Sequence, residues 1–344
     1  MSNTIDTTQV KLTPKDFASG QDVRWCPGCG DYSILAQVQR VLPELGIPKE
    51  QIIWISGIGC SSRFPYYMGT YGFHTIHGRA AAIATGVKVS RPELSVWVAT
   101  GDGDMMSIGG NHFIHTCRKN VDLKILLFNN RIYGLTKGQY SPTSEVGLIS
   151  KSTPYGSVDY PFNPLSLALG SGATFVARAA DNDPKHMQEM IKRAAEHKGT
   201  AFLEILQNCV IFNDGAYDAI TGKENRTDKM LYLKHNQPMT FGKDNSKGIK
   251  LDGFKPVVID LNDGVHSAND CWIHDETDHD AARSFILAHM TDHPELPVPF
   301  GVVRQEYKTT YDQAVSNQIA AVTEKRGKGD LQKILRGGNT WEIA

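Results

Sequence analysis

Two stretches of the chain place oxygen-bearing side chains directly after short apolar runs. Gly101-Asp102-Gly103-Asp104 follows the run from Leu94 to Ala99, and Asn129-Asn130 follows the run from Leu123 to Phe128. Both runs are short and mostly apolar, so we predict two buried strands of a parallel sheet, connected by a helix from Ile108 to Arg118. The carboxyl ends of neighbouring parallel strands meet at one edge of a sheet, where ligands bind. The side chains of Asp102 and Asn130 should therefore converge there.

Oxygen ligands that converge in this way suit a magnesium ion. Mg2+ prefers near-octahedral oxygen coordination and is usually held by one or two protein side chains together with phosphate oxygens. Asp102 offers a carboxylate oxygen, Asn130 an amide oxygen and Ile132 a backbone carbonyl. Gly101 and Gly103 let a phosphate approach the backbone, and the start of the following helix offers free amides to an anion. The expected ligand is a diphosphate bridged by Mg2+.

The spacing of the two stretches resembles the thiamine-diphosphate fingerprint. GDG at 101–103, then residues 104–128, then the asparagine pair at 129–130 follow the order of that motif. Its spacing, flanking strands and paired asparagines make it more specific than a single glycine motif. An Asp-Gly pair alone would be an ordinary strand turn with a capping aspartate. Because both halves are present, the pattern favours cofactor binding.

A second glycine-bearing strand end should lie beside the first. The predicted strand from Ile52 to Ile55 runs into residues 56–63, and His77 follows directly before Gly78 and an alanine-rich stretch that predicts a helix. A histidine in this position either contacts the cofactor or serves as a hydrogen-bonded structural residue. The residues alone leave both interpretations open.

Four of the six cysteines fall at loops or strand ends on the side where the diphosphate is expected. The knuckle Cys26-Pro27-Gly28-Cys29 is tight, because proline fixes one dihedral and glycine permits the turn, while Cys60 and Cys209 follow predicted strands. Four thiolates can hold structural zinc or a 4Fe-4S cluster, and the residues alone do not separate these. Cys117, in a predicted helix, and Cys271, in a polar tail, should be packing or surface cysteines.

Composition limits the class of protein. A net charge of -1 from 36 basic and 37 acidic residues predicts no attraction to nucleic acid or membrane surfaces. No apolar run reaches the length of a membrane span, and the polar first 20 residues do not resemble a signal peptide. We expect a cytoplasmic protein.

The remaining pattern predicts an α/β fold with a doubly wound, mostly parallel sheet. We expect an N-terminal arm over 1–22 that is mobile or wraps a partner, a cofactor-binding domain over 23–225, and a C-terminal extension over 226–344 that contacts a partner subunit. Periodicity and caps predict further elements within these parts. The predicted helices are 31–45, 164–170, 184–197 and a stretch near 280–290, and the predicted strands are 174–177 and 201–206.

A group of polar residues in the extension could be drawn as a metal site. It consists of His274, Asp275, Asp278 and His279. A solvated polar helix start explains these residues equally well, so we predict no metal there.

The motifs together resemble the beta subunits of 2-oxoacid:ferredoxin oxidoreductases, in particular those of the 2-oxoglutarate type. The resemblance runs from about residue 22 to residue 220 and extends more loosely into the tail. It rests on CPGCG, GIGCSSRF, HGRAAAIATG, GDGDMMSIGGNH, NNRIYGLTKGQYSPTS and the late Cys209. It implies the fold of thiamine-diphosphate-binding domains, in the type that binds the diphosphate end of the cofactor.

The resemblance also implies roles for single residues. One 4Fe-4S cluster would be held by Cys26, Cys29, Cys60 and Cys209. Mg2+ would be held by Asp102, Asn130 and the Ile132 carbonyl. Arg63 would present a positive charge to the substrate carboxylate, with a surface arginine as the alternative interpretation. Thiamine diphosphate would be contacted by Ile58, Gly59, Cys60, Ser61, His77, Gly101, Asp102, Gly103, Asp104, Asn130, Gly134 and Leu135.

The implied activity is conversion of 2-oxoglutarate, coenzyme A and oxidised ferredoxin to succinyl-CoA, CO2 and reduced ferredoxin. Related folds take the carboxylate that activates thiamine from a separate pyrimidine-binding domain, which this chain lacks, so an alpha subunit and an (alpha-beta)2 assembly are expected. Alternatives are the same chemistry on pyruvate, branched-chain or aryl 2-oxo acids, a non-oxidative thiamine-dependent decarboxylase or ligase with structural zinc, and a regulatory subunit that keeps the fold.

Two departures from the family pattern bear on substrate choice. Pyruvate-specific relatives show Asn-Thr-Gly after the metal loop, whereas this chain has Gly134-Leu135-Thr136. This difference favours a larger 2-oxo acid. Lys137 stands where many relatives have glycine, which leaves the fine specificity open.

Overall fold

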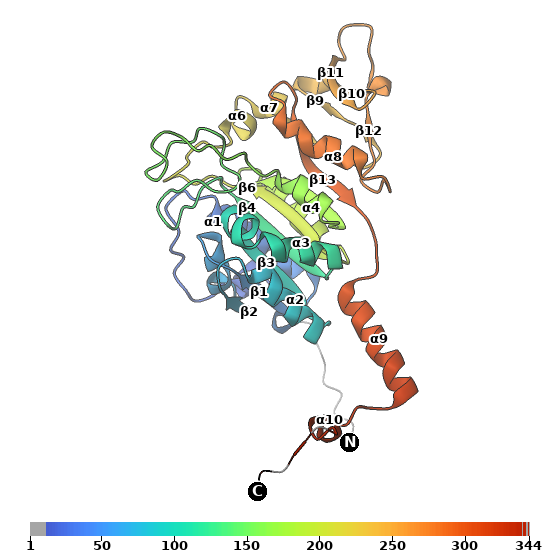
Figure 1. The fold of residues 1–344 in the computed structure, drawn as a ribbon. Helices are drawn as coiled ribbons and strands as arrows, with labels where there is room; N and C mark the ends of the chain where they lie inside the picture. Colours follow the sequence, from blue (N-terminus) through green and yellow to red (C-terminus); the bar gives the residue numbers. More distant parts are fainter. Residues whose placement is uncertain (1–11, 339, 342, 344) are drawn as a thin grey trace, which may run out of the picture.

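The molecule is built around an eight-stranded sheet in the order β2-β1-β3-β4-β6-β5-β13-β7 (Figure 1). The structure is a computed structural model that describes residues 12–338, 340, 341 and 343. Neighbouring strands are parallel except where β13 runs antiparallel to β5. The strands are β1 (Ile52–Ser56), β2 (Tyr71–His74), β3 (Ser95–Gly101), β4 (Leu123–Asn129), β5 (Phe175–Ala180), β6 (Ala201–Leu206), β7 (Met230–Tyr232) and β13 (Val298–Gln305).

Helices cover both faces of this sheet, as in a doubly wound fold. The helices on one face are α1 (Asp31–Val41) and α5 (Pro184–Glu196). Those on the other face are α2 (Ala80–Ser90), α3 (Gly110–Lys119), α4 (Pro164–Gly170) and α8 (Ala282–His289). The central strands have apolar residues on both faces: Trp97 packs toward α1, and its neighbour Val98 packs toward the opposite layer. The predicted fold class is confirmed.

The strand order predicts a ligand-binding site at the carboxyl ends of β1 and β3. From β1 the chain adds β2 on one side, and from β3 it adds β4 on the other, so the order changes direction between β1 and β3. Open α/β sheets bind ligands outside the carboxyl ends of the strands at such a point. The segments that follow β1, β3 and β4 therefore meet at one edge, as the sequence predicted.

The C-terminal part is more closely integrated with the sheet than the predicted boundary at 225/226 implied. β7 and β13 come from this part, and β13 pairs with β5 through residues 301–305. Arg178 of β5 and Gly301 of β13 are register partners. The predicted domain therefore does not contain the whole sheet, because a distant segment completes one side of it.

The rest of the C-terminal part forms small elements at one end and along one side of the molecule (Figure 1). A three-stranded sheet contains β9 (Thr240–Phe241), β10 (Lys247–Asp252) and β11 (Lys255–Asp260), and β8 (Gln237–Pro238) pairs with β12 (Ile273–His274). α6 (Asp218–Thr221) and α7 (Arg226–Lys229) precede β7, while α9 (Tyr311–Arg326) and α10 (Leu331–Leu335) follow β13.

Short 3-10 turns and one π-turn complete the described structure. The 3-10 segments are Pro14–Phe17, Leu42–Leu45, Lys49–Gln51, Ser61–Tyr67, Lys243–Asn245, Ala268–Asp270 and Met290–Asp292. The π-turn Asp104–Ile108 leads from β3 into α3. A simple strand-turn-helix pattern would predict regular α-helix in this segment.

Two predictions, one about the N-terminal arm and one about His274, need correction. Residues 12–22 are not a detached arm, because Phe17 is fully buried in the core on the α1 side; residues 1–11 lie outside the described part. His274 does not belong to a solvated helix start, because it is buried in β12 and its Nε2 lies 2.8 Å from the Val302 carbonyl oxygen.

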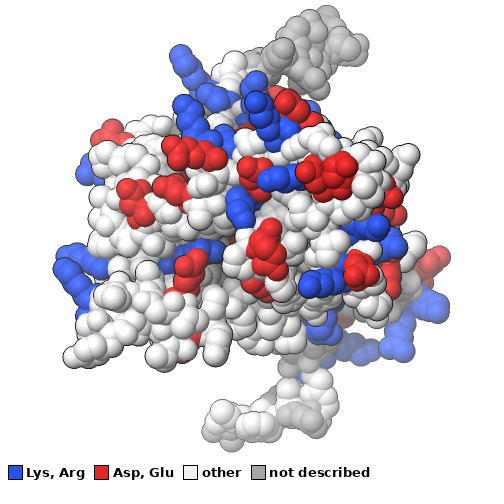
Figure 2. Space-filling model, turned by 90° about the horizontal axis from the view of Figure 1, so that it is seen from above, with Lys and Arg blue, Asp and Glu red and all other residues white. Residues whose placement is uncertain are grey.

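Charges of both signs are interspersed on the face shown in Figure 2. Within the described part of the chain, none of the helices combines the length and the apolar character that crossing a bilayer requires.

Candidate functional site

A cavity of about 550 Å³ opens at the carboxyl ends of β1, β3 and β4. Its lining includes all twelve residues predicted to contact the cofactor, together with Ile132. Segments from four separate parts of the sequence meet there. The complete lining is Ile58, Gly59, Cys60, Ser61, His77, Gly101, Asp102, Gly103, Asp104, Phe128, Asn130, Ile132, Tyr133, Gly134, Leu135, Thr136 and Gln139.

Gly103 gives one wall of the cavity its shape. A Cβ at this position would lie 2.2 Å from Cε1 of Tyr133, so only glycine admits the tyrosine ring here. The ring is fixed by its hydroxyl, which donates a 2.9 Å hydrogen bond to the Gly103 carbonyl oxygen. The loop after β4 is thereby fastened to the turn after β3, because the two residues fit against each other.

Asp102 is buried at the start of this turn. Its Oδ2 accepts hydrogen bonds from the hydroxyls of Ser141 and Thr143, the latter at 2.6 Å. Burial raises the pKa of the Asp102 carboxyl, and the two hydroxyls act against this rise because they stabilise the anion. Both hydroxyls bind the same oxygen, so neither of them occupies Oδ1.

Asn130 and Ile132 lie on the loop that follows β4. Arg131 between them has a φ of +57°, and this left-handed residue turns the chain sharply. The Asn130 side-chain oxygen accepts a 3.2 Å hydrogen bond from the Ile132 amide. Asn213 donates a 3.0 Å hydrogen bond from Nδ2 to the Asn130 carbonyl oxygen, which ties this loop to the segment after Cys209. With the Asp102 carboxylate, this set of oxygens suits a hard cation such as Mg2+.

Asp104 holds the ends of the strands together. Its Oδ1 accepts hydrogen bonds from the Ile58 amide at 3.0 Å and the Gly78 amide at 2.7 Å. Nδ1 of His77 lies 2.7 Å from the same oxygen, and the Thr100 hydroxyl donates to Oδ2 at 2.8 Å. Because Nδ1 faces Asp104, the Nε2 edge of the His77 ring points away from this carboxylate. Asp104 therefore orients His77 at the cavity.

Arg63 lies outside this cavity. It lines a neighbouring cavity of about 380 Å³, which shares Gly59 and Leu135 with the first. Its Nη1 donates a 3.0 Å hydrogen bond to the Arg24 carbonyl oxygen. The predicted substrate-binding arginine thus lines a cavity next to the cofactor cavity, and Gly59 and Leu135 line both.

The four predicted cluster ligands come from three segments that are joined to one another. The knuckle closes with a hydrogen bond from the Cys29 amide to the Cys26 carbonyl oxygen, and Gly30 donates to the carbonyl oxygen of Asn208, directly before Cys209. A Cβ on Gly134 would lie 3.5 Å from Sγ of Cys209 and 3.6 Å from Sγ of Cys60. The loop after β4 therefore reaches the sulfurs at a glycine.

Two thiols of this group, those of Cys29 and Cys60, are partly buried near Asp31. Burial raises the pKa of the Cys60 thiol to about 12 and also raises that of Cys29, and the nearby Asp31 adds to both increases. Such thiols stay protonated unless a metal centre stabilises the thiolates. Among the described residues, no three His, Cys, Asp or Glu side chains are close enough to one another to hold a single metal ion. Whether the ligand is a cluster stays a prediction.

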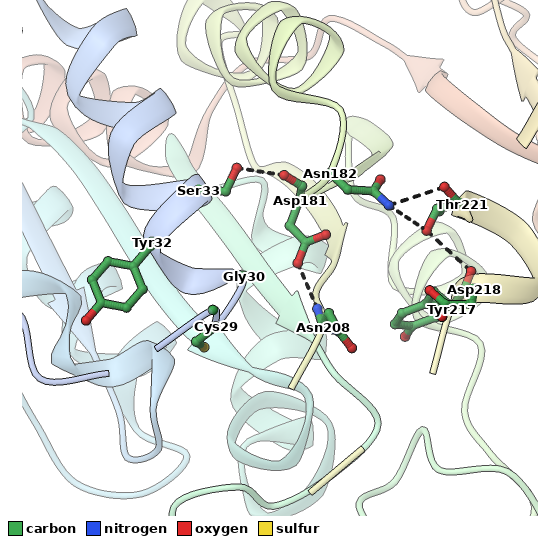
Figure 3. Close-up of a pocket in the computed structure, with 11 residues that line it drawn as sticks. Cys29, Gly30, Tyr32, Ser33, Asp181, Asn182, Asn208, Tyr217, Asp218 and Thr221 are labelled. Atoms are coloured by element: carbon green, nitrogen blue, oxygen red, sulfur yellow. Dashed lines mark hydrogen bonds between the residues drawn. The ribbon is translucent and has the colours of Figure 1, made fainter. Parts of the chain in front are cut away.

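A second cavity of about 460 Å³ lies beside the knuckle (Figure 3). Asp181 faces it and is held by the Asn208 amide, which donates a 2.8 Å hydrogen bond to Oδ2. Ser33 donates a 2.6 Å hydrogen bond to the Asp181 carbonyl oxygen, which connects α1 to the end of β5. Burial and the nearby Asp181 raise the pKa of Asp31 to about 7.

The other cysteines are packing residues. Cys117 is fully buried in α3, as predicted for a helix interior, and Cys271 is buried although the sequence placed it in a polar tail. Sγ of Cys271 lies where a side chain on Gly248 would have to be, 2.3 Å from a Cβ built there. This close approach to β10 explains its burial.

Sequence reasoning missed Ser141 and Thr143. Both lie within the motif NNRIYGLTKGQYSPTS, yet no role was assigned to them. The available signal was two hydroxyl residues shortly after the predicted metal loop. The distance of 39 and 41 residues from Asp102 hides the contact.

Comparisons with known proteins agree with the geometry. The family model "Thiamine pyrophosphate enzyme, C-terminal TPP binding domain" matches residues 57–205. The chain is 50% identical over 341 residues to the 2-oxoglutarate oxidoreductase subunit KorB of Mycobacterium tuberculosis, covering 98% of this chain and 91% of that subunit. It is 46% identical over 192 residues to the 2-oxoacid:ferredoxin oxidoreductase subunit beta of Saccharolobus solfataricus, covering 55% and 63% respectively.

A solved structure with the same fold is also similar over nearly the whole chain. It is the 2-oxoglutarate:ferredoxin oxidoreductase from Magnetococcus marinus with 2-oxoglutarate, coenzyme A and succinyl-CoA bound. The TM-score is 0.75 at 36% identity, and the match covers 97% of this chain and 98% of that one.

Proposed function

Because the chain belongs to the 2-oxoacid:ferredoxin oxidoreductases as a beta subunit, we propose that it works with an alpha subunit on 2-oxoglutarate. The reaction joins 2-oxoglutarate and coenzyme A to give succinyl-CoA and CO2, and two electrons pass singly to two oxidised ferredoxins. A low-potential donor would drive it in reverse. The observation that carries this proposal is the cavity at the strand ends, which adjoins the cysteine sulfurs at Gly134.

Thiamine diphosphate and Mg2+ would occupy the cavity. Oδ1 of Asp102, the Asn130 amide oxygen and the Ile132 carbonyl would hold the cation, and the turn at 101–103 would face the diphosphate. When bound, thiamine diphosphate would supply a carbon nucleophile and an electron sink for decarboxylation of the 2-oxo acid. The chain supplies the fixed positions of these oxygens, so the diphosphate is oriented before the substrate arrives.

His77 would exchange a proton at the cavity. Asp104 accepts a hydrogen bond from Nδ1 of His77, and this bond fixes both the tautomer and the plane of the ring. Nε2 is left to accept or donate a proton. This is the arrangement in which a carboxylate orients a histidine for general acid-base work.

Cys26, Cys29, Cys60 and Cys209 would hold one 4Fe-4S cluster. Its chemical contribution is to accept electrons one at a time and pass them to ferredoxin. The support is that Gly134, in the loop after β4, lies close to the sulfurs of Cys60 and Cys209, and that the knuckle is hydrogen-bonded to the residue before Cys209. A short path from cofactor to cluster follows from this arrangement.

Arg63 would bind a carboxylate of the substrate. Its neighbouring cavity shares Gly59 and Leu135 with the cofactor cavity, so a dicarboxylic 2-oxo acid could reach from one to the other. A guanidinium is well suited to bind a carboxylate through two hydrogen bonds. This supports 2-oxoglutarate over pyruvate, which lacks the second carboxylate.

The site needs a partner subunit. Two carboxylates line the cofactor cavity, and both are engaged: Asp102 by Ser141 and Thr143, and Asp104 by its four donors. The carboxylate that activates thiamine would therefore come from an alpha subunit, in an (alpha-beta)2 assembly. We further propose a cytoplasmic location, where coenzyme A and ferredoxin are available.

The test is the visible absorption spectrum of the alpha-beta complex, purified without oxygen, together with its iron and acid-labile sulfide content. We expect a brown protein with about four irons per beta chain that bleaches when 2-oxoglutarate and coenzyme A are added. Pyruvate and branched-chain 2-oxo acids should bleach it more slowly. A colourless protein with one zinc per beta chain, or turnover without coenzyme A or an electron acceptor, would contradict the proposal.

A further inference from the structure

Two hydroxyls from one loop meet at a single oxygen of Asp102. Ser141 and Thr143 are 2% and 3% exposed, and both donate to Oδ2. Two donors on one oxygen restrict rotation of the carboxylate group about its Cβ–Cγ bond, so the group is held in one plane. The other oxygen, Oδ1, accepts from neither hydroxyl.

We propose that Ser141 and Thr143 are positioning residues for the divalent cation. They occupy Oδ2 of Asp102 and thereby direct Oδ1 toward the cation that binds Asn130 and Ile132. This inference rests on the proposed function, because it assumes that a cation binds at Asp102. It adds two residues to the site that do not touch the cation.

Buried polar residues form a chain of contacts behind Thr143. Its hydroxyl lies 2.8 Å from Oδ1 of Asn129, whose Nδ2 donates a 2.7 Å hydrogen bond to Oε1 of Glu204. Glu204 in turn accepts a 2.7 Å hydrogen bond at Oε2 from Nε of Arg178. Each member is buried, and a buried ion pair keeps its geometry because breaking it is costly.

The register of the sheet fixes this chain in place. Arg178 and Glu204 are partners across β5 and β6, and Asn129 is the last residue of β4, beside Leu206 of β6. The position of Thr143 is therefore set by three central strands and not only by its own loop. Two hydroxyls on a mobile loop would only give the buried Asp102 carboxylate its hydrogen-bond donors. Hydroxyls held by a rigid sheet also fix the orientation of the carboxylate, and this is the positioning role.

The loop also offers a control residue. Ser157 is buried to the same degree, at 4% exposure, and its hydroxyl donates a 2.8 Å hydrogen bond to the Glu145 carbonyl oxygen. This hydrogen bond is made to the backbone and does not involve Asp102. Ser157→Ala removes a buried hydroxyl from the same loop but leaves the Asp102 contacts in place.

The test measures cation affinity directly. The alpha-beta complex is stripped of thiamine diphosphate and Mg2+, and Mn2+ binding in the presence of thiamine diphosphate is followed by the electron paramagnetic resonance signal of free Mn2+. We expect Ser141→Ala and Thr143→Val each to weaken Mn2+ binding about tenfold, because each removes a hydrogen bond to a charged group. Thr143→Ser keeps the hydroxyl and should bind Mn2+ as the wild type does, as should Ser157→Ala.

The outcomes separate this inference from the function it rests on. If the wild type fails to bind Mn2+ with thiamine diphosphate, the proposed function fails. If the wild type binds and both hydroxyl-deleting variants bind equally well, the positioning role is wrong. If Thr143→Val does not assemble with the alpha subunit, Ser141→Ala, which removes only an oxygen, decides alone.

Discussion

Asp104 brings the two amides of Ile58 and Gly78 to one oxygen and a histidine to the same point. If the Asp104 carboxylate were removed, each of these donors would lack its acceptor. A buried donor without an acceptor costs roughly 1–3 kcal/mol. The residue was predicted to contact the cofactor, and it does line the cavity. Its hydrogen bonds point instead to a role in holding the strand ends and His77.

Replacing Asp104 by asparagine should separate these two tasks. The amide oxygen can still accept from the Ile58 and Gly78 amides, so the melting temperature of the alpha-beta complex should change little. Without the negative charge, the tautomer of His77 is less well fixed, and kcat for 2-oxoglutarate should fall about 10- to 100-fold. Asp104→Ala should lower both. An unchanged kcat in Asp104→Asn would show that the charge does not act through His77.

His197 provides a pH-dependent term in stability. Burial lowers the pKa of this histidine to about 4, and the nearby Lys124 adds to the decrease. In the unfolded chain its pKa is about 6.5, so between these values the unfolded state binds more protons than the folded one. The free energy of unfolding should therefore fall by up to about 3 kcal/mol as the pH drops from roughly 6.5 to 4.

This dependence can be isolated with His197→Gln. Its amide can still meet the Thr174 hydroxyl, which lies 2.8 Å from Nε2 of the histidine, but it does not titrate. Melting temperatures of the wild-type and variant complexes should be measured at several pH values. As the pH falls from roughly 6.5 to 4, the wild type should lose stability faster than the variant. Parallel curves would show that His197 is not the group responsible.

Single residues also show where prediction from sequence ends. Asp102 and Asn130 could be predicted because a strand pattern places both at one sheet edge. Ser141 and Thr143 could not, because their contact depends on how a long loop folds back. Arg63 follows Cys60 by only three residues, yet the 3-10 turn Ser61–Tyr67 carries its side chain to the neighbouring cavity.

At the level of elements, the connection from β3 into α3 determines the shape of the cavity. The π-turn Asp104–Ile108 precedes α3, and Gly103 before it has a φ of -66° and a ψ of -32°, which any residue can adopt. The requirement for glycine here is therefore steric and comes from the Tyr133 ring.

Gly103→Ala should displace Tyr133 and reshape the cavity wall. We expect the affinity for thiamine diphosphate, measured by quenching of tryptophan fluorescence, to fall about tenfold or more, because overpacking typically costs about 1–3 kcal/mol. Gly110→Ala is the matched control: it lies in α3, has nothing within 4 Å of its built Cβ, and should bind normally. Equal affinity in all three proteins would show that Tyr133 yields without consequence.

The elements differ in how far the sequence predicts them. β1, β3 and β4 are mostly apolar and are buried on both faces, so their pattern is clear in the sequence. β2 is exposed along its whole length and has no such signal. β13 contains Pro299 and a left-handed Gly301, at φ +112°, and pairs with strands far away in sequence, so no local pattern predicts its place in the main sheet.

At the level of the whole molecule, the C-terminal helices stand apart from the main sheet. α9 and α10 extend away from the sheet (Figure 1), and apolar side chains on both are solvent-exposed. These are Ile319, Val322, Leu331, Ile334 and Leu335. Exposed apolar groups of this kind commonly mark protein-protein contacts. The predicted contact of the C-terminal part with a partner subunit is consistent with this exposure.

Removal of residues 328–344 should test that contact. The cut follows Gly327, the residue that ends α9, and takes away α10 with its three exposed leucine and isoleucine side chains. We expect the thiamine and cysteine sites to stay intact and the alpha-beta assembly to dissociate at higher protein concentration than the full chain, as measured by analytical ultracentrifugation. An unchanged dissociation constant would exclude α10 from the interface.

β13 also sets an order of events during synthesis. The segments that form the cofactor cavity end near residue 139 and the last predicted cluster cysteine is Cys209, whereas β13 begins only at Val298. A chain emerging from the ribosome can thus assemble its cavity while β5 still lacks the neighbour that covers its edge. An uncovered edge strand invites pairing with other chains. The newly made subunit is therefore most prone to aggregate in the interval before residue 305 is released.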